Sequence, residues 1–464
     1  MTHTEQNEGN IMSDLLFTFA AMATRTDGDL TALKGMERLA EVLHPHGVRI
    51  TWLITPGIAE RLREPLTKWH EENGDDVAIA PEGLRRDHTG FDLGTMQGQI
   101  DAMAAAAKDT RDRVRKILPW TKADVAHGVH QNHIALQALE QAGFVGIWGF
   151  CFEQIEVDGI TDRGIPWGFA YIDSKCRTAP NTEPGGLISM EWTARDLLKS
   201  YHSGNPTVWS TDVNDAARSG LCRWRDCDYL KRMFDEYYRN LRWNDLVVYQ
   251  VHQEAHEMMP EFGCYSEEDC VEAMEMLDEL AGHAMGHLGV RSVSLSDAAA
   301  EYRSRNTITA PSYMLWRDIP VGPYNDDYSR GTPRGPWPKT FLTYDSECQL
   351  MFVDGGFEPR TIRNYRLRNH ETGAPDQPYY AEPIIPRVRL KLNNRSPYGA
   401  EIVFEVEAPH AMPMGVTFWE DWGPYLWDSG EGILDHKIIS GELMYLRMNV
   451  EAGKQEYRIK LRRK

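Results

Sequence analysis

Short apolar runs and helix-like segments alternate along the first two thirds of the chain. Residues 96–117 form the strongest helical pattern, with many Ala, acidic residues early and basic residues late, as the helix dipole favours. Strands separated by helices indicate a parallel sheet, and about eight such units indicate a closed (β/α) barrel. The strand-like runs are residues 15–21, 48–55, 76–81, 123–129, 145–152, 206–212, 245–252 and 290–296.

The pattern changes after about residue 302. Residues 303–340 are rich in Pro and Gly and are expected to form a linker. In residues 341–464, apolar and polar positions alternate with a period of two between turn signals, which predicts antiparallel strands and a β-sandwich. Residues 1–12 are polar and are expected to form a disordered tail. The sequence therefore predicts an α/β chain, with a (β/α) barrel in residues 13–302 and a C-terminal antiparallel β-sandwich.

Composition excludes some partners. The 464 residues are 42% hydrophobic and 26% charged, which is ordinary for a globular chain with more than one domain. A formal net charge of −19 would repel nucleic acid and anionic membranes, so we expect neither as a partner. Seven Cys without framework spacing and an N-terminus without an apolar leader predict a cytoplasmic protein. The sequence leaves a homo-oligomer open.

The apolar run at residues 246–251 ends abruptly in the polar segment HQEAHE, residues 252–257. In α/β enzymes, chemistry gathers at the carboxyl ends of parallel strands, so we expect His252 and Glu254 to be catalytic. His252 and His256 are four residues apart, which on a helix would place both on one face and suit a metal. The spacing is HxExH and not HExxH. A metal site and a solvated loop therefore both remain open.

Two other strand ends carry His or Asp side chains. His127, His130 and His133 recur at intervals of three where a strand meets a helix. They could bind a metal or polarise a substrate oxygen, and they could equally cap the helix. We expect His130 to contact the substrate. Asp212 ends the run WSTD and is a candidate catalytic residue, with a helix N-cap as the alternative.

Acidic and aromatic side chains follow two further segments. Glu153 comes directly after an apolar run, and two carboxylates across a sugar are the minimum apparatus for glycoside hydrolysis. Trp167 could stack on a sugar ring, although an ordinary acidic loop also explains residues 151–167. Glu191 and Trp192 lie side by side in SMEWTARDL, where sugar binding and the start of an amphipathic helix are both open. Trp192 is taken as a second substrate-binding residue.

Four segments carry a resemblance to a known superfamily. They are GVRITWLI (47–54), GDDVAIAPEG (74–83), DLVVYQVHQ (245–253) and GVRSVSLSDAAAEY (289–302). In order and character they resemble the glycoside hydrolase/deacetylase (β/α)-barrel superfamily, and the whole chain resembles polysaccharide-deacetylase-like proteins with a C-terminal β domain. The resemblance implies that His252 stands at the general-acid His of deacetylases. It also implies that Glu153 stands near the catalytic Glu of glycoside hydrolase family 57.

The departures from the deacetylase pattern concern its metal site. The first strand, FTFAAMATRTDGD, lacks the Asp pair that deacetylases carry, and the two metal-binding His of their second motif are absent. Glu82 stands near that place and is taken as substrate-binding. A divalent metal such as zinc therefore stays open as a cofactor. The motifs GxSxG, GxxxxGK[ST] and GxGxxG after a strand are also absent, which disfavours serine hydrolases, P-loop enzymes and Rossmann enzymes.

These observations predict a hydrolase that acts on a small-molecule or oligosaccharide substrate. We expect a glycoside hydrolase that uses strand-end carboxylates and His. A divalent-metal-dependent sugar deacetylase and a non-catalytic carbohydrate-binding protein are the alternatives. Because the carboxyl ends of barrel strands share one face, one set of side chains should line one cleft. That set is Glu82, His130, Glu153, Asp212 and His252.

Overall fold

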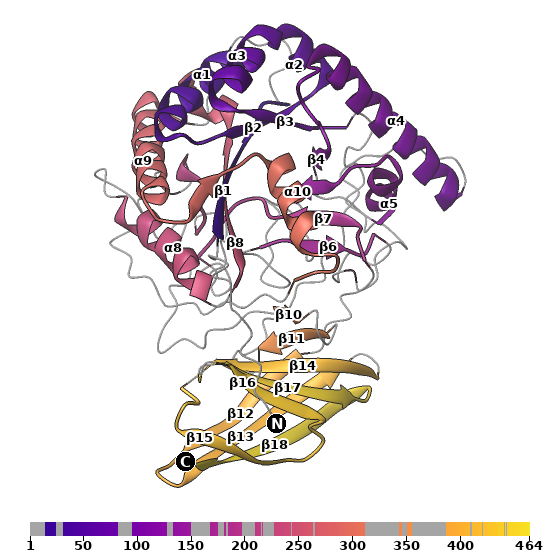
Figure 1. Ribbon diagram of the computed structural model, residues 1–464, viewed down its shortest axis with the longest axis vertical. Coiled ribbons are helices and arrows are strands. Elements are labelled where there is room, and N and C mark those ends of the chain that lie inside the picture. The colour runs from indigo at the N-terminus through magenta and orange to yellow at the C-terminus, as the bar shows by residue number, and fades with distance from the viewer. Residues whose placement is uncertain are drawn as a thin grey trace, which may run out of the picture.

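The computed structural model gives the arrangement of most of the chain (Figure 1). The residues that it describes are 14–24, 31–81, 95–127, 133–149, 168–174, 181, 184–196, 209–214, 216, 227–242, 244–262, 265–310, 343–345, 350–354, 387–408, 411–419, 421–439, 441 and 443–464. Among them, no helix is both long enough and apolar enough to span a membrane.

A nine-stranded sheet forms the centre of the N-terminal part, in the order β6-β7-β5-β4-β3-β2-β1-β8, with β9 beside the start of β1. Every pairing is parallel except that of β6 with β7. The sheet curls into a half-barrel, as Figure 1 shows. Its strands are β1 (Asp14–Met22), β2 (Ile50–Ile54), β3 (Asp76–Ile79), β4 (Val125–His127), β5 (Gly146–Trp148), β6 (Ala170–Ile172), β7 (Leu187–Met190), β8 (Leu246–Glu254) and β9 (Val290–Ser292).

All the helices except α10 lie on the convex face of this sheet (Figure 1). Side chains alternate along β1. Phe17 and Phe19 pack in the core under the helices, while Leu16 and Ala20 pack in a second core on the concave face. The helices are α1 (Thr31–Leu43), α2 (Pro56–Arg61), α3 (Arg63–Asn73), α4 (Met96–Ile117), α5 (His133–Gln141), α8 (Asp228–Arg239), α9 (Glu267–Met285) and α10 (Leu295–Arg305).

Helix α10 closes the concave face at the amino ends of the strands. Leu295 N donates to Thr51 Oγ1 of β2 at 3.0 Å, and Arg303 donates to Gly186 O just before β7 at 2.6 Å. The helix thus runs from one side of the half-barrel to the other. The carboxyl ends of the strands, where the sequence predicts the chemistry, stay clear of it.

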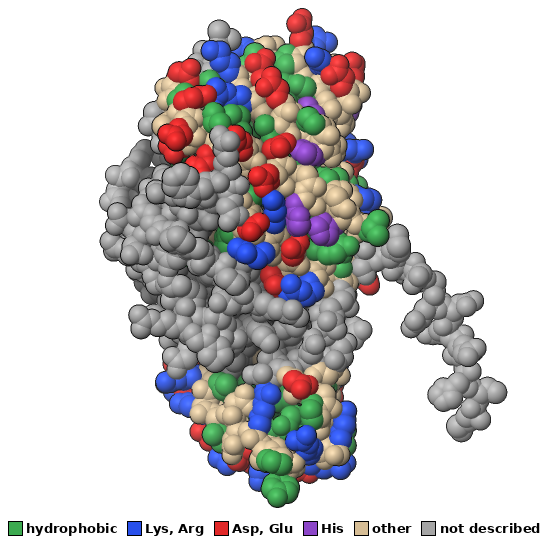
Figure 2. Space-filling view, turned by 90° about the vertical axis from the view of Figure 1, so that its left-hand side faces the viewer, with side chains coloured by type: hydrophobic (Ala, Val, Ile, Leu, Met, Phe, Trp, Pro, Cys, Tyr) green, Lys and Arg blue, Asp and Glu red, His purple; other side chains and the backbone are tan. Residues whose placement is uncertain are grey.

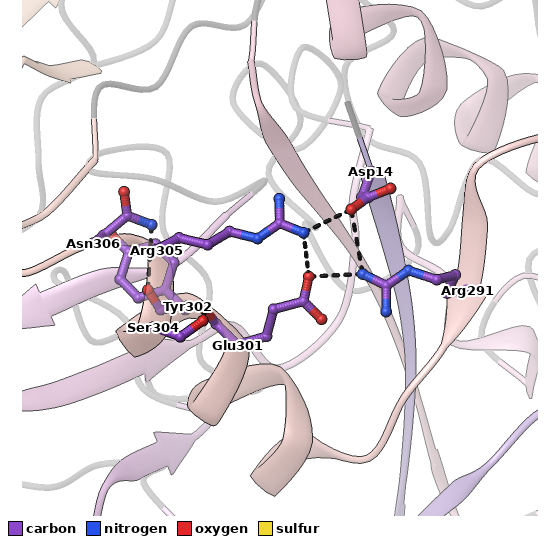
Figure 3. Close-up of polar contacts among 7 residues, drawn as sticks. All are labelled: Asp14, Arg291, Glu301, Tyr302, Ser304, Arg305 and Asn306. Carbon is purple, nitrogen blue, oxygen red and sulfur yellow. Dashed lines mark hydrogen bonds and ion pairs between the residues drawn. The ribbon is translucent and has the colours of Figure 1, made fainter. Parts of the chain in front are cut away.

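A four-membered ion-pair network fixes α10 to the start of β1 (Figure 3). Asp14 Oδ2 lies 2.6 Å from Arg305 and 3.4 Å from Arg291. Glu301 Oε1 lies 2.5 Å from Arg305 and 2.7 Å from Arg291, so two carboxylates alternate with two guanidinium groups. Networks of this kind stabilise more than isolated surface pairs do. The network therefore holds α10 in place over the amino ends of the strands.

The C-terminal part consists of two β-sheets that share a core. The five-stranded sheet has the order β10-β11-β14-β17-β16, and the four-stranded sheet has the order β12-β13-β18-β15. Phe404 of β13 packs against Phe418 of β14, with ring centroids 5.3 Å apart. The strands are β10 (Thr343–Asp345), β11 (Leu350–Asp354), β12 (Arg387–Arg395), β13 (Gly399–Ala408), β14 (Met412–Trp419), β15 (Tyr425–Gly430), β16 (Asp435–Ile439), β17 (Leu443–Val450) and β18 (Gly453–Arg463).

The predicted fold class, a (β/α) barrel followed by an antiparallel β domain, is confirmed, with the barrel present as a half-barrel. The strand expected at 206–212 is reduced, among its described residues, to a single bridge between Ser210 and Arg195. The domain limits stay predictions, because the tail (1–12) and most of the linker (311–340) lie outside the described residues.

Candidate functional site

Strand β8 presents polar side chains to the concave face at its carboxyl end. Val247 and Val251 point into the core under the helices, and Val248 points into the core of the concave face. By the alternation of a strand, His252 and Glu254 share the side of Val248. His252 is 3% exposed and Glu254 is 8% exposed, so both are buried although both are titratable.

Three aromatic or imidazole rings from separate segments gather around His252. The ring of Trp192 lies 4.3 Å from that of His252 and stacks on Trp148 at 4.3 Å, with 14° between the two indole planes. Trp148 Nε1 donates to Trp192 O at 3.2 Å, which fixes the pair. The ring of His127, at the end of β4, lies 5.9 Å from that of Trp192. The ends of β4, β5 and β8, with the segment after β7, therefore meet at one edge of the sheet.

The imidazole of His252 is buried. Neither of its ring nitrogens has a hydrogen-bond partner in the described part of the chain. Burial, and then the nearby charge of Arg195, hold the pKa of His252 well below its usual 6.5. The imidazole is therefore neutral at pH 7 and has a lone pair free to accept a proton.

Glu191 has the opposite electrostatic character. It directly follows β7, and burial raises its pKa well above the usual 4.5, although Arg195 and the backbone N–H of Trp192 lower it in part. The carboxyl group therefore stays protonated above the pH at which a free Glu ionises. Arg195 is the charged neighbour that Glu191 and His252 share.

Arg195 is held by its backbone. Its N–H donates to Tyr237 Oη of α8 at 3.1 Å, and that hydroxyl donates to Arg195 O at 3.2 Å. Next to it, Ala194 N donates to Gln250 O of β8 at 2.6 Å. The segment after β7 is thus joined to β8 by a backbone hydrogen bond and to α8 through Tyr237. Residues 191–196 are not helical, so the amphipathic helix that the sequence left open here does not begin at Glu191 or Trp192.

A second cluster of titratable groups lies just beyond β8. Glu254 Oε2 lies 3.0 Å from His256 Nε2, and Asn214 Nδ2 donates to Glu257 Oε2 at 3.5 Å. One donor atom from each of Glu254, His256 and Glu257 lies within 4.8 Å of the others. Two carboxylates and an imidazole suit a divalent transition metal such as zinc. These residues could therefore hold a metal at the edge of the site.

Helix α1 packs directly against the backbone that carries this second cluster. A Cβ on Gly35 would lie 1.8 Å from Ala255 O, in the 3₁₀ helix at Ala255–Met258. Arg38 Nη1, one turn later in α1, donates to Met258 O at 2.8 Å. Only a residue without a side chain fits here, so α1 fixes the backbone that carries His256.

The other predicted site residues have mixed outcomes. Asp212 is half-buried, and its Oδ1 accepts from Asn214 N at 3.1 Å, as a capping side chain does. Its neighbour Thr211 donates from Oγ1 to Gln250 O at 3.2 Å, so Asp212 follows a contact with β8. Trp192 is buried at 2% exposed. Glu82, His130, Glu153 and Trp167 lie outside the described residues.

The sequence did not single out Arg195, and it named Glu191 only as an alternative. The signal that could have found Glu191 is the apolar run LISM at 187–190, which follows two Gly as a strand often does. With a strand placed there, Glu191 would stand at a strand end like the other candidates.

No protein-family model matches the chain, and no curated protein matches its sequence. A similar solved structure is a protein assigned as a polysaccharide deacetylase from Pseudomonas aeruginosa (11% identity, TM-score 0.41, 63% of this chain and 92% of that one). Another is a 4-alpha-glucanotransferase from Thermococcus litoralis (9% identity, TM-score 0.40, 98% of this chain and 100% of that one). A third is a GH57-type branching enzyme from Pyrococcus horikoshii (9% identity, TM-score 0.35, 63% of this chain and 71% of that one). At these identities and TM-scores the likeness assigns no activity.

Proposed function

We propose that this protein is a carbohydrate-active hydrolase whose acid–base chemistry takes place around His252. The observation that carries the proposal is this buried imidazole, which has no hydrogen-bond partner among the described residues and lies against Trp192. Leaving a buried polar group unsatisfied costs about 1–3 kcal/mol. A folded protein that keeps such a group at the carboxyl end of a parallel strand gains from its chemistry and not from its packing.

Two groups with opposite pKa shifts supply the two halves of a hydrolysis. Neutral His252 accepts a proton from the attacking water, and protonated Glu191 donates a proton to the leaving oxygen. Both shifts have burial as their largest cause, and both groups feel the charge of Arg195. A base and an acid whose environments drive their pKa values apart are what hydrolysis near neutral pH requires. The Arg195 guanidinium is suited to stabilise negative charge as it develops.

A carbohydrate substrate is supported by the resemblance of the strand-end segments to glycoside hydrolases and deacetylases of the (β/α)-barrel type. For glycoside hydrolysis, Glu254 supplies the second carboxylate and Glu191 the first. The two lie on β8 and after β7, which Ala194 and Gln250 join by a backbone hydrogen bond. Two carboxylates in different environments are the usual apparatus of that reaction.

The second candidate is a metal-dependent sugar deacetylase. The cluster of Glu254, His256 and Glu257 favours it, because these three residues offer a donor set for a divalent metal. A metal held there would activate water or polarise an acyl oxygen. His252 would first take a proton from the attacking water and then donate it to the leaving group, the role that its resemblance to the deacetylase His implies.

The two candidates are separated by substrate class and by metal dependence. Purified protein is assayed on a panel of aryl glycosides and on acetylated oligosaccharides, with chelator and with added Zn²⁺. Glycosidase activity that survives chelation supports the first candidate. Acetate release that needs the metal supports the second. Sugar binding without turnover under any of these conditions contradicts both.

A pair of His variants tests the role of His252 on whichever substrate is turned over. His252→Gln should lower turnover at least about a hundredfold, the usual scale for a positioned acid or base. His70 is the matched control, because its ring also stacks on a Trp, Trp120, at 4.2 Å, but on the outer side of the sheet. His70→Gln should leave turnover per folded molecule unchanged. Equal turnover in the two variants would remove His252 from the mechanism.

A further inference from the structure

A second group of His and Asp side chains lies far from the strand ends just described. Asp235 of α8 and His283 of α9 face each other, and His287 follows the end of α9. Val290 N, at the start of β9, donates to His287 O, and β9 pairs with the first half of β1. The group therefore lies toward the amino ends of the strands. Figure 2, which faces the side of α8 and α9, shows His side chains at the surface among acidic and basic ones.

The three side chains point their polar atoms at one place. His283 Nε2 lies 2.8 Å from Asp235 Oδ1, and His287 Nε2 lies 3.7 Å from the same oxygen. One donor atom from each of the three lies within 4.8 Å of the others. Around a tetrahedral zinc with bonds of about 2.0–2.1 Å, donor atoms lie about 3.3 Å apart. The two distances to Asp235 Oδ1 lie on either side of that value, and the third pair of donor atoms lies within 4.8 Å.

The tautomer of His287 is set by the backbone. Its Nδ1 lies 2.8 Å from His283 O, and a carbonyl oxygen can only accept a hydrogen bond. The proton is therefore on Nδ1, which leaves the lone pair on Nε2 directed toward Asp235. Metal-binding His residues are commonly oriented by a second hydrogen bond of this kind.

Aromatic contacts hold both imidazoles in place. The ring of Phe234 meets those of His283 and His287 edge to face, with centroids 5.7 and 5.2 Å away. Tyr238, one turn later in α8, lies 4.7 Å from His287 and donates from its hydroxyl to Leu288 O at 2.9 Å. Ring orientation is thus fixed before any ligand arrives, which lowers the entropy lost on binding.

We propose that Asp235, His283 and His287 form a binding site for a transition-metal ion of the zinc, cobalt or nickel class. Two imidazoles and one carboxylate suit these metals and not calcium or magnesium, which prefer oxygen donors. Each side chain is 27–41% exposed, which leaves a coordination position for water. The bound ion joins α8 to the end of α9 and stabilises the fold. This site is independent of the proposed hydrolase chemistry.

The same helix offers a matched control that lacks the second His. His46 Nε2 lies 2.7 Å from Asp278 Oδ1 of α9, and the His side chain is 27% exposed, as those of His283 and His287 are. If Asp235 and His283 formed only an ion pair, adding metal should affect them no more than it affects Asp278 and His46. A metal site predicts that only the group with two His responds.

The test uses full-length protein stripped with a chelator and returned to chelator-free buffer. Zn²⁺ is titrated calorimetrically, Co²⁺ is followed by its visible absorption, and bound ions per chain are counted. The His283→Gln/His287→Gln double variant should bind one ion fewer than the wild type. Asp235→Asn should weaken binding at least about tenfold. His46→Gln should bind as the wild type does. The count also separates this site from any ion at Glu254.

Two results would overturn the proposal. One is the same number of ions and the same affinity in the wild type and the double variant. The other is an equal loss in His46→Gln. If the double variant fails to fold, the wild type still decides the matter: carbethoxylation of His283 and His287, mapped by mass spectrometry, should fall when Zn²⁺ is present. Unchanged carbethoxylation of both residues would contradict the proposal.

Discussion

Replacing His252 with Leu should remove activity without weakening the fold. Leu has a similar volume and no polar atoms, so the variant no longer buries two ring nitrogens that lack partners in the described part of the chain. Each unsatisfied buried group costs about 1–3 kcal/mol. The lost ring contact with Trp192 offsets about 0.5–1.5 kcal/mol of that gain. At pH 7 the free energy of unfolding should therefore rise by between about 0.5 and 5.5 kcal/mol.

The pH dependence of this effect has a definite sign. Because the folded pKa of His252 lies well below its usual 6.5, the unfolded chain binds more protons than the folded one below that pH. The free energy of unfolding is then at its full value above about pH 6.5. It falls by about 1.4 kcal/mol for each pH unit below 6.5, until the pH reaches the folded pKa of His252. His252→Leu should remove this loss.

Glu191 should change the free energy of unfolding with pH in the opposite direction. Its folded pKa is raised well above the usual 4.5, so the folded chain binds more protons than the unfolded one above that pH. Stability is fully present below about pH 4.5 and falls as pH rises toward the folded pKa, again by about 1.4 kcal/mol per pH unit. Glu191→Gln mimics the protonated acid and should remove that loss.

The assay is urea unfolding of the wild type and of both variants between pH 4.5 and 8. In the wild type the two pH-dependent losses of stability oppose each other between about pH 4.5 and 6.5. The free energy of unfolding of His252→Leu should therefore differ most from that of the wild type at low pH, and that of Glu191→Gln at high pH. A loss of more than about 1 kcal/mol in His252→Leu at pH 7, as is ordinary for a buried substitution, would refute the reasoning. It would mean that the imidazole nitrogens have partners.

Three further predictions follow from particular contacts. Gly35→Ala places a Cβ 1.8 Å from Ala255 O, so despite the helix preference of Ala, worth about 1 kcal/mol, it should destabilise by about 1–3 kcal/mol in urea unfolding. Glu254→Gln should lower turnover at least about a hundredfold with little change in melting temperature. A lower melting temperature with normal turnover would make Glu254 structural. Trp422→Ala, in the C-terminal core, should destabilise that part by about 3–5 kcal/mol and leave turnover per folded molecule unchanged.

Much of the fold could be predicted because its elements carry strong local patterns. The helix expected at 96–117 is observed over Met96–Ile117, and the antiparallel strands expected within residues 341–464 include β13 and β18. In α9, Ser266 and Asp269 form the capping box, a local sequence signal that starts the helix. Strands β6 and β7 were missed, because three or four apolar residues are too few to distinguish a strand from a buried loop.

The site was harder to predict because its parts meet only in space. His252 and Glu254 could be found, since they end a long apolar run on one strand. Arg195 could not, because its influence on His252 depends on the hydrogen bonds that join the segment after β7 to β8 and α8. The place of Asp235 beside His283 was equally invisible, since 48 residues separate them along the chain. Pairing between distant segments leaves no local pattern.

The pH dependence of kcat/KM tests the central claim most directly. With His252 as the base and Glu191 as the acid, the profile should be bell-shaped, with an acid limb below pH 6.5 and an alkaline limb above pH 4.5. Glu191→Gln should lower the rate and remove the alkaline limb, and His252→Gln should abolish most turnover. An unchanged profile with full turnover in His252→Gln would contradict the account.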